Sequence, residues 1–193
     1  MSEKTPMYRY AYPHPAVATD MCIFTLVAAD LHLLLIKRAR APFRGRWALP
    51  GGFLKADETL DTCARRELME ETGISPLALH PFGVFSDPKR DPRERVISVA
   101  YLALVPEAAA KLAARSDAAA AGWFSMGDLP KLAFDHAVII GKARDALRQR
   151  LKDISAALAL VPETFTLGQL QAVYQAVEGV PLDKRNFRGD STR

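Results

Sequence analysis

The residues GFLKADETLDTCARRELMEETGI, from Gly52 to Ile74, contain the change of pattern that decides the fold. Gly52 follows Gly51, and a glycine pair lets the backbone turn sharply or approach a ligand closely. Beyond the pair, apolar residues recur at helical spacing: Leu60, Ala64 and Leu68. This pattern predicts a core-facing helix with Asp57 as its N-cap and Gly73 as the residue that ends it.

Three glutamates lie on one side of this predicted helix. Glu67, Glu70 and Glu71 are three and four residues apart, so their side chains are neighbours on the helix surface. Repulsion between like charges destabilises an isolated helix, and a cation would relieve it. Mg²⁺ prefers carboxylate oxygens together with substrate phosphates. The alternative is a solvated acidic face, which is common on surface helices, but the adjoining glycine pair favours a site for a metal and a polyanion.

The same residues carry a family resemblance. Gly52, Glu58 and the run Arg66-Glu67-Leu68-x-Glu70-Glu71-x-Gly73-Ile74 resemble a complete Nudix box, the motif of the Nudix hydrolases. The resemblance extends loosely over residues 16–155, and the sequence WALPGG at residues 47–52 is similar to one often found there in the family. It implies an α/β/α sandwich in which the box forms a loop, a helix and a second loop.

The resemblance also implies roles for the matching residues. The expected ligands of Mg²⁺, with Mn²⁺ as the alternative, are the Gly51 carbonyl, Glu67, Glu70 and Glu71. The catalytic candidates are Glu67, Glu70 and Arg66, and Arg66 would orient the glutamates by charge-assisted hydrogen bonds. Metal ions in such a site polarise a phosphoryl oxygen and activate a bound water. Glu58 is expected at the helix start, where a negative charge favours the helix dipole. The spacing leaves open which glutamate is the general base.

The rest of the chain has the alternation of an α/β protein. Apolar and β-branched segments predict strands at residues 16–28, 31–37, 47–53, 77–85, 96–105 and 122–125, with a hairpin turn at residues 29–30. A long helix is predicted from residue 136 to about 160, and a helical or irregular connection at residues 108–121. These elements predict a mixed sheet between helices. We divide the chain into an N-terminal tail (1–15), a Nudix domain (16–160) and a helical C-terminal segment (161–193).

The substrate class is indicated by a charged loop and the strand after it. Residues 86–95 carry four basic and three acidic side chains. This loop, residues 96–101 and the pair Asp135-His136 resemble the ADP-ribose pyrophosphatase-like branch of the family and its regulatory relatives. ADP-ribose carries two phosphates and a base, so the substrate-binding candidates are Arg38, Arg44, Arg90 and Trp47, with Phe85 as a second stacking ring. The alternatives are a solvated loop, a helix-start histidine and aromatic rings buried in the core.

The C-terminal segment fits a plain Nudix domain poorly. Residues 165–179 predict a helix with Thr166 as N-cap and Gly179 as the residue that ends it, and a second short helix begins at Pro181. Together these resemble the start of the winged helix in the Nudix-related transcriptional regulators of NAD metabolism. From Pro162 onward the basic and acidic residues balance, whereas a DNA-reading surface is basic. We therefore expect weak DNA binding without sequence preference. The alternative for this segment is a helical appendage that packs on the Nudix domain or forms a homodimer contact.

Composition limits the remaining choices. The net charge is +4, which permits anionic ligands without demanding nucleic acid. Two cysteines, Cys22 and Cys63, fit a reducing compartment, and no apolar run is long enough to span a bilayer, so a cytoplasmic protein is expected. The expected function is Mg²⁺-dependent hydrolysis of a pyrophosphate bond in a nucleoside diphosphate derivative, with ADP-ribose favoured. The alternative is an ADP-ribose-sensing transcriptional regulator, or a remnant of one.

Overall fold

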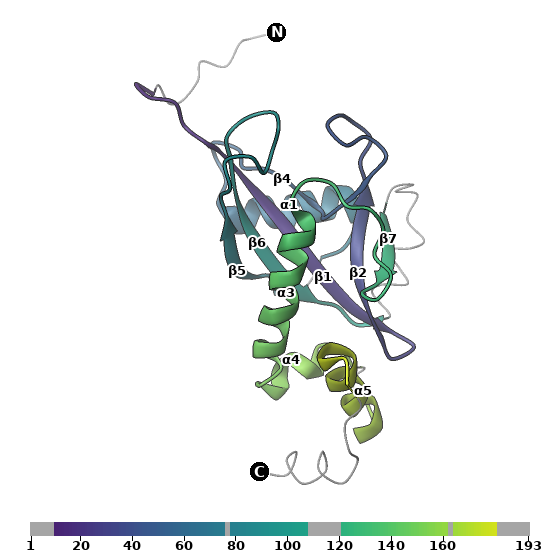
Figure 1. The fold of residues 1–193 in the computed structure, drawn as a ribbon. Helices are drawn as coiled ribbons and strands as arrows, with labels where there is room; N and C mark the ends of the chain where they lie inside the picture. Colours follow the sequence, from purple (N-terminus) through teal and green to yellow (C-terminus); the bar gives the residue numbers. More distant parts are fainter. Residues whose placement is uncertain (1–9, 76–77, 108–120, 162–163, 181–193) are drawn as a thin grey trace.

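The computed structural model describes residues 10–75, 78–107, 121–161 and 164–180, and these form a seven-stranded mixed sheet covered by helices (Figure 1). The strands are β1 (Ala16–Val27), β2 (Asp30–Lys37), β3 (Trp47–Ala48), β4 (Gly51–Phe53), β5 (His80–Phe85), β6 (Val96–Leu104) and β7 (Ala121–Ser125). The order is β3-β2-β1-β6-β5, with β4 on β1 and β7 on β2. The β1–β6 pair is parallel, and the other strand pairs are antiparallel.

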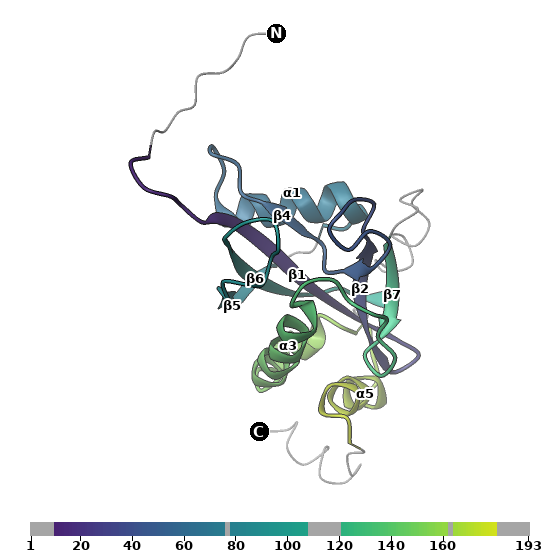
Figure 2. The same ribbon diagram turned by 45° about the horizontal axis from the view of Figure 1, so that its top comes forward.

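Helices lie on both faces of this sheet, which confirms the α/β/α sandwich (Figures 1 and 2). The helix α1 (Leu60–Thr72) covers one face, where Leu68 packs in an apolar cluster with Met21 and Tyr101. The helix α3 (His136–Arg150) covers the other face and packs in the larger cluster. Both clusters take residues from β1, because successive side chains of a strand point to opposite faces.

The hairpin and the glycine pair differ in detail from the sequence-based expectation. The β1–β2 turn is formed by Ala28 and Ala29, both with positive φ, one residue earlier than expected. Gly51 and Gly52 were expected in a turn after a single strand. They lie instead in β4, which pairs antiparallel with β1, while β3 pairs with β2. The expected strand thus divides into two because its halves hydrogen-bond to different neighbours.

The ends of α1 show one correction and one agreement. Asp57 was wrong as the N-cap: Thr59 takes this position, and its side chain accepts a hydrogen bond from the Thr62 N–H. A cap must lie just before the first helical residue, and the chain between Gly52 and the helix is two residues longer than the apolar pattern indicated. Gly73 ends the helix with φ of 70°, as predicted.

The helix predicted from residue 136 to about 160 is two helices in the structure. The first, α3, ends at Arg150, and α4 (Ile154–Leu158) follows. Asp153 explains the break, because its side chain accepts a hydrogen bond from the Ser155 N–H and so begins a new helix. Within the described part of the chain, no helix is both long and apolar enough to cross a membrane.

The C-terminal helix α5 (Leu167–Glu178) begins and ends as predicted. Thr166 and Gln169 form a reciprocal capping box, and Gly179 ends the helix with φ of 75°. Leu170, Val173 and Val177 are buried in the same apolar cluster as α3 and the sheet. The alternative interpretation of this segment, a helix that packs on the Nudix domain, describes the position of α5. The second short helix from Pro181, and most of the connection at 108–121, lie outside the described residues.

Candidate active site

Two glycines allow β4 to lie close to its neighbours. A Cβ atom at Gly51 would overlap the backbone oxygen of Thr19 on β1, and one at Gly52 would overlap the carboxylate of Glu67. A side chain at Gly51 would therefore push β4 away from β1, whereas one at Gly52 would displace the carboxylate of Glu67. The strand presents its backbone directly to the glutamate face of the helix.

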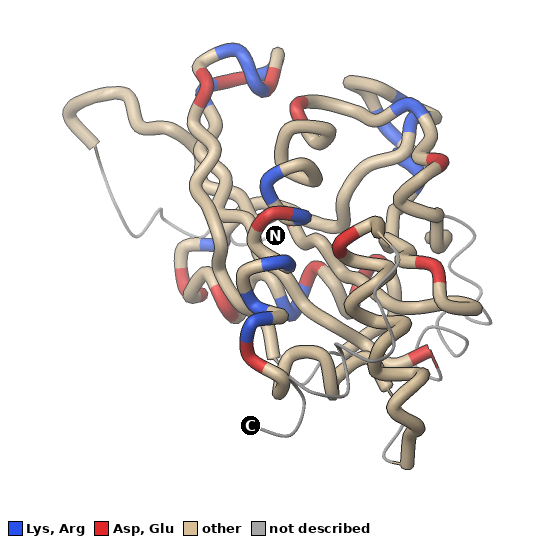
Figure 3. Tube along the Cα trace, turned by 60° about the horizontal axis from the view of Figure 1, so that its bottom comes forward, with Lys and Arg blue, Asp and Glu red and all other residues tan. Residues whose placement is uncertain are grey.

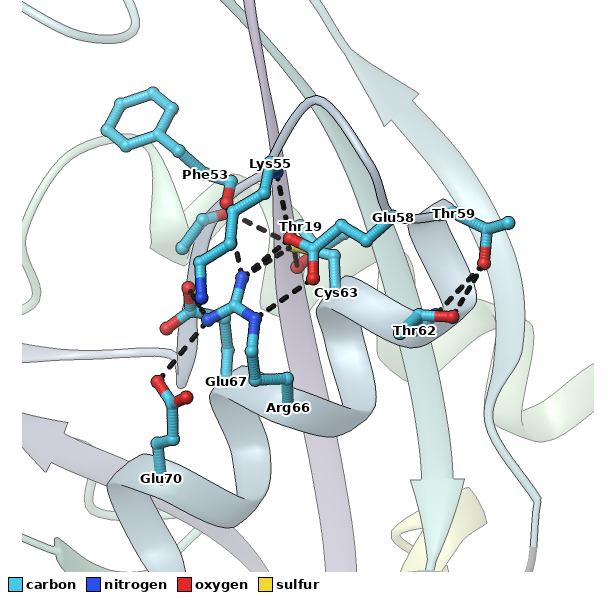
Figure 4. Close-up of polar contacts among 11 residues, drawn as sticks. Thr19, Phe53, Lys55, Glu58, Thr59, Thr62, Cys63, Arg66, Glu67 and Glu70 are labelled. Atoms are coloured by element: carbon cyan, nitrogen blue, oxygen red, sulfur yellow. Dashed lines mark hydrogen bonds and ion pairs between the residues drawn. The ribbon is translucent and has the colours of Figure 1, made fainter. Parts of the chain in front are cut away.

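Arg66 is the centre of the polar contacts on this face (Figure 4). Its guanidinium donates two hydrogen bonds to Glu58, at 2.9 and 2.7 Å, and one to Glu67 at 2.6 Å. A longer contact of 3.3 Å reaches Glu70. These hydrogen bonds lower the pKa of Glu58 to about 2 and raise that of Arg66. The expected contacts between Arg66 and the two glutamates are therefore present.

Glu58 has a partner that the helical spacing did not indicate. It was expected at the helix start, where its charge would interact with the helix dipole. The residue lies before α1, where the helical projection does not apply, and its Oε1 accepts a hydrogen bond from the Lys55 N–H at 2.8 Å. This loop contact turns the carboxylate back onto Arg66, so Glu58 fixes the guanidinium that in turn holds Glu67.

Glu71 occupies a different environment from Glu70. Its Oε2 accepts a hydrogen bond of 2.8 Å from the Gly51 N–H, and its side chain faces the interior beside β4. The pKa of Glu71 is raised to about 7, chiefly by burial and also by the nearby carboxylates of Glu67 and Asp20, and the hydrogen bond opposes this increase. The Glu70 side chain, in contrast, is 57% exposed.

The donor set suits a hard divalent cation. Burial raises the pKa of Glu71 most, and the nearby carboxylates of Glu67 and Asp20 raise it further; a bound cation would offset both effects. Carboxylate oxygens are the ligands that Mg²⁺ prefers. Among the described residues, no three acidic, histidine or cysteine side chains are gathered in a ready-made cluster. Glu67 and Glu70 are turned towards Arg66, so metal binding would need a change of their side-chain rotamers.

A cavity of about 200 Å³ adjoins Glu71. Its lining includes Gly51, Gly52 and Glu71 together with Arg38, Arg93 and Phe134. Arg38 donates from Nε to the Pro42 carbonyl at 2.8 Å and lies 4.6 Å from the centre of the Phe134 ring. Within the described chain, its two terminal nitrogens have no protein hydrogen-bond acceptor. Burial, and then repulsion from Arg93, lower the pKa of Arg38. A ligand anion would relieve both effects.

A buried network of charged groups forms the floor of this cavity. Asp20 on β1 contacts Arg90 at 3.0 Å, Ser98 at 2.6 Å and Nε2 of His136 at 3.4 Å. Arg90 also donates two hydrogen bonds to Asp135 just before α3. The network therefore connects β1, the charged loop, β6 and the start of α3.

The four predicted substrate-binding residues are in different surroundings. Arg38 lines the cavity as expected. Arg90 also lines it, but its side chain is 5% exposed and its guanidinium is shared by Asp20 and Asp135. We therefore reinterpret Arg90 as a positioning residue rather than a phosphate clamp. Arg44 is exposed on the loop before β3. Trp47 packs edge-to-face on Phe124, with ring centres 4.5 Å apart, which is the core alternative.

Sequence reasoning missed Arg93 and Phe134 as cavity residues. Arg93 is held by two hydrogen bonds to Asp91 and lies over the rings of Phe53 and Phe134. The sequence signal was the alternation of acidic and basic residues in the loop at 86–95, which indicates internal ion pairs. Phe134 carried no such signal, since its position depends on the turn before α3.

Comparison with known proteins identifies the class that this fold and site define. The NUDIX domain model matches residues 17–142, and the model of the NrtR DNA-binding winged helix domain matches residues 157–191. The chain belongs to the Nudix family and is a Nudix hydrolase, with a C-terminal segment of the NrtR type.

Two relatives match different shares of the chain. The ADPR responsive transcriptional repressor NtrR of Acinetobacter baylyi is 35% identical over 181 residues, which are 92% of this chain and 72% of the relative. The ADP-ribose pyrophosphatase of Methanocaldococcus jannaschii is 46% identical over 129 residues, which are 67% and 73% of the two chains. The chain is thus similar to both a regulator and an enzyme, and the resemblance to the ADP-ribose pyrophosphatase-like branch is confirmed.

Solved structures give the same picture. Shewanella oneidensis NrtR complexed with a 27mer DNA superimposes with a TM-score of 0.79 at 33% identity, covering 91% of this chain and 82% of that one. The NUDIX domain of the same protein complexed with ADP ribose gives a TM-score of 0.62 at 30% identity, covering 71% and 91%. The DNA complex and the winged-helix match weigh against our sequence-based expectation of weak DNA binding.

Proposed function

We propose that this Nudix hydrolase cleaves the pyrophosphate bond of ADP-ribose or a closely related nucleoside diphosphate derivative, with Mg²⁺ as cofactor and Mn²⁺ as a substitute. One observation carries the proposal: Glu71, beside Glu67, and the unsatisfied guanidinium of Arg38 line the same cavity. A carboxylate that attracts cations and a guanidinium that attracts anions thus line one cavity. A diphosphate with a bound divalent metal ion satisfies both.

The relatives support ADP-ribose as the substrate. One relative with 46% identity is named an ADP-ribose pyrophosphatase, and a related NUDIX domain has been solved with ADP ribose. The cavity of about 200 Å³ adjoins a second, larger space, so the site has room for a nucleotide with two ends. A cytoplasmic location belongs to the proposal, because Cys22 and Cys63 are both free thiols.

Each residue of the site has a separate role in the proposed hydrolysis. Glu67, Glu70 and Glu71, with the Gly51 carbonyl, would hold the metal, which supplies charge neutralisation on the phosphates and an acidified water. Arg66 positions Glu67, and Glu58 positions Arg66. Arg38 binds a non-bridging phosphate oxygen and stabilises the negative charge that develops as the bridging P–O bond breaks. Water adds to one phosphorus, and the products from ADP-ribose are AMP and ribose 5-phosphate.

A substrate panel tests this function. ADP-ribose, NADH, diadenosine polyphosphates, nucleotide sugars and 8-oxo-dGTP are incubated with the full chain, and products are separated by chromatography. We expect AMP from ADP-ribose with Mg²⁺ or Mn²⁺, no product with EDTA, and recovery when the metal is restored. Hydrolysis that is unaffected by EDTA, or a preference for a mononucleoside triphosphate, would overturn the proposal.

A second candidate function is ligand-responsive DNA binding. The winged-helix match at residues 157–191 favours it, and α5 at the start of that segment is well formed. The charge count began at Pro162 and so did not include the basic residues of α3 and of the turn after it. These are Lys142, Arg144, Arg148, Arg150 and Lys152. In the view of Figure 3, basic and acidic segments lie beside one another, which moderates the attraction to phosphate.

Fluorescent duplexes titrated at about 150 mM salt decide between the two DNA expectations. Sub-micromolar binding to one duplex, which resists competitor DNA and is weakened by ADP-ribose, would establish the regulator. Equal, weak binding to all duplexes would leave the enzyme as the function of the chain.

A further inference from the structure

The apolar stripe of the catalytic helix α1 has an acidic side chain on each flank. Ala64 and Leu68 are buried in this stripe. Successive residues of a helix are about 100° apart, so the positions three residues before and three residues after Ala64 lie about 60° to either side of it. These positions are Asp61 and Glu67. Asp61 therefore lies on the flank of α1 opposite Glu67.

Polar contacts with β1 and β4 hold the flank that carries Glu67. Cys63 lies on this flank, and its thiol is 3.6 Å from the hydroxyl of Thr19 on β1. Glu71 accepts the hydrogen bond of 2.8 Å from the Gly51 N–H on β4. This side of α1 is thus held to the two strands beside the cavity.

Tyr101 of β6 holds the other flank. Its hydroxyl donates a hydrogen bond of 2.6 Å to Oδ1 of Asp61, which is exposed in the first turn of α1. The Tyr101 side chain is buried and packs in the apolar cluster that contains Met21 and Leu68. Burial, and then the contact with Asp61, raise the pKa of Tyr101, so the phenol keeps its proton and remains the donor.

Apolar packing alone does not fix the rotation of α1 about its axis. Burial of the stripe is favourable but not directional, whereas a short hydrogen bond has a preferred distance and angle. The proposed metal ligands come from two elements, since the Gly51 carbonyl is on β4 and Glu67 and Glu70 are on α1. A roll of the helix would change the distances between them, and a misplacement of about 1 Å can cost about 10²-fold in rate.

We infer that Tyr101 is a positioning residue for the metal site, because its hydrogen bond to Asp61 fixes the rotation of α1 against β4. The inference rests on the proposed function, which gives the glutamates of α1 their role. It adds a residue of β6, a strand that contributes no proposed ligand, to those that determine the geometry of the site.

Steady-state kinetics, together with Mn²⁺ binding without substrate measured by electron paramagnetic resonance, test the inference on the full chain. Tyr101→Phe removes only the hydroxyl, and Asp61→Ala removes its acceptor at an exposed position where folding is preserved. For both variants we expect about tenfold lower kcat and about tenfold weaker Mn²⁺ binding, as when an outer contact of a metal site is lost. The KM for ADP-ribose should stay within about twofold, because Arg38 lies on the loop after β2 and not on α1.

Two further variants separate positioning from stability. Asp61→Asn keeps an oxygen that accepts the hydrogen bond, so it should retain the kcat and the Mn²⁺ affinity of the wild type. Val173→Ala is the matched control for lost stability, since Val173 is buried in α5 on the face of the sheet opposite α1 (Figure 2). We expect this variant to lower the thermal midpoint and to leave kcat and Mn²⁺ affinity unchanged.

The outcomes distinguish this inference from the proposed function. Wild-type kcat and Mn²⁺ affinity in Asp61→Ala overturn the inference. Equal losses in Asp61→Asn and Asp61→Ala also overturn it, because the charge at the helix start would then matter and not the hydrogen bond. Weaker Mn²⁺ binding by Tyr101→Phe and Asp61→Ala, rescued in Asp61→Asn, supports the inference even in a chain that hydrolyses no substrate, and that chain would overturn the proposed hydrolysis alone.

Discussion

The backbone N–H of Leu49 donates a hydrogen bond of 2.8 Å to Nδ1 of His136, so this ring nitrogen carries no proton. The proton of the neutral ring is then on Nε2, which faces the Asp20 carboxylate at 3.4 Å. Burial lowers the pKa of His136, because the charged ring would lose both solvent and this hydrogen bond. The contact joins the strand before the glycine pair to the start of α3.

Protonation of His136 should therefore destabilise the fold in acid. The folded pKa lies below the unfolded value of about 6.5, so the unfolded chain binds more protons and the stabilisation is lost as the pH falls below about 6.5. The comparison is between wild type and His136→Asn, which cannot titrate. We expect the difference in unfolding free energy to shrink towards pH 5, by up to about 1.4 kcal/mol per pH unit. Urea titrations at several pH values measure it, and a constant difference would contradict the assignment.

Glu71→Gln should separate stability from activity. The substituted amide keeps an acceptor for the Gly51 N–H, but the substitution removes a carboxylate whose pKa is raised to about 7. In metal-free buffer the charge costs stability above pH 7, and this cost disappears as the pH falls towards about 4.5. We expect a higher thermal midpoint at pH 8, no gain at pH 4.5, and a kcat lower by at least ~10²-fold with Mg²⁺.

Glu70→Gln is the matched control for that result, because Glu70 is largely exposed and pairs with Arg66. Its thermal midpoint without metal should change little, while its kcat falls as well. A Glu71→Gln protein that is less stable at pH 8 would show that the carboxylate is neutralised within the protein.

The two glycines of β4 should respond differently to alanine. Gly51→Ala places a methyl group against the backbone of Thr19, which cannot move aside, so we expect a loss of about 1–3 kcal/mol in unfolding free energy. Gly52→Ala displaces the flexible end of Glu67 instead. We expect near wild-type stability for Gly52→Ala and a kcat about 10²-fold lower. Equal activity of Gly52→Ala and wild type would remove Glu67 from the catalytic set.

Arg38→Met should raise the KM for ADP-ribose by about 10- to 100-fold, the effect of losing a hydrogen bond between charged groups. Arg44→Met is the control, since Arg44 is exposed on the same loop. Steady-state kinetics with both variants distinguish the two arginines, which the sequence placed together. An equal increase in KM for both variants would show that Arg44 also binds the substrate.

Local signals in the sequence predicted the catalytic helix well. Features that depend on contacts between residues far apart in the sequence could not be predicted. Gly73, Thr166 and Gly179 occupy the predicted helix ends because capping depends on a few adjacent residues. The Asp20 network could not be read from the sequence, since it joins residues 70 and 78 positions apart. For the same reason the sequence predicted that Arg90 would bind a phosphate, whereas in the structure it is a buried ion-pair partner of Asp20.

Glu58 shows a different limit. If the helix began before Glu58, helical spacing would place this residue on the side opposite Glu67. Glu58 lies instead in the loop before α1, and this loop directs its carboxylate towards Arg66. Spacing gives reliable directions only inside a regular element. The side-chain directions of residues in the flanking loops can be read only from the structure.

The burial of Leu170, Val173 and Val177 of α5 against the sheet has a consequence for dissecting the chain. Matches to two family models suggest two modules that could be expressed separately, yet α5 completes the apolar layer of the first one. Truncation before Thr166 would leave Leu31, Leu33 and Leu147 without part of their cover, so we expect such a fragment to have a lower thermal midpoint than the full chain. Because α5 shares the apolar layer with α3 and the sheet, we expect the described residues of the full chain to melt in one cooperative transition.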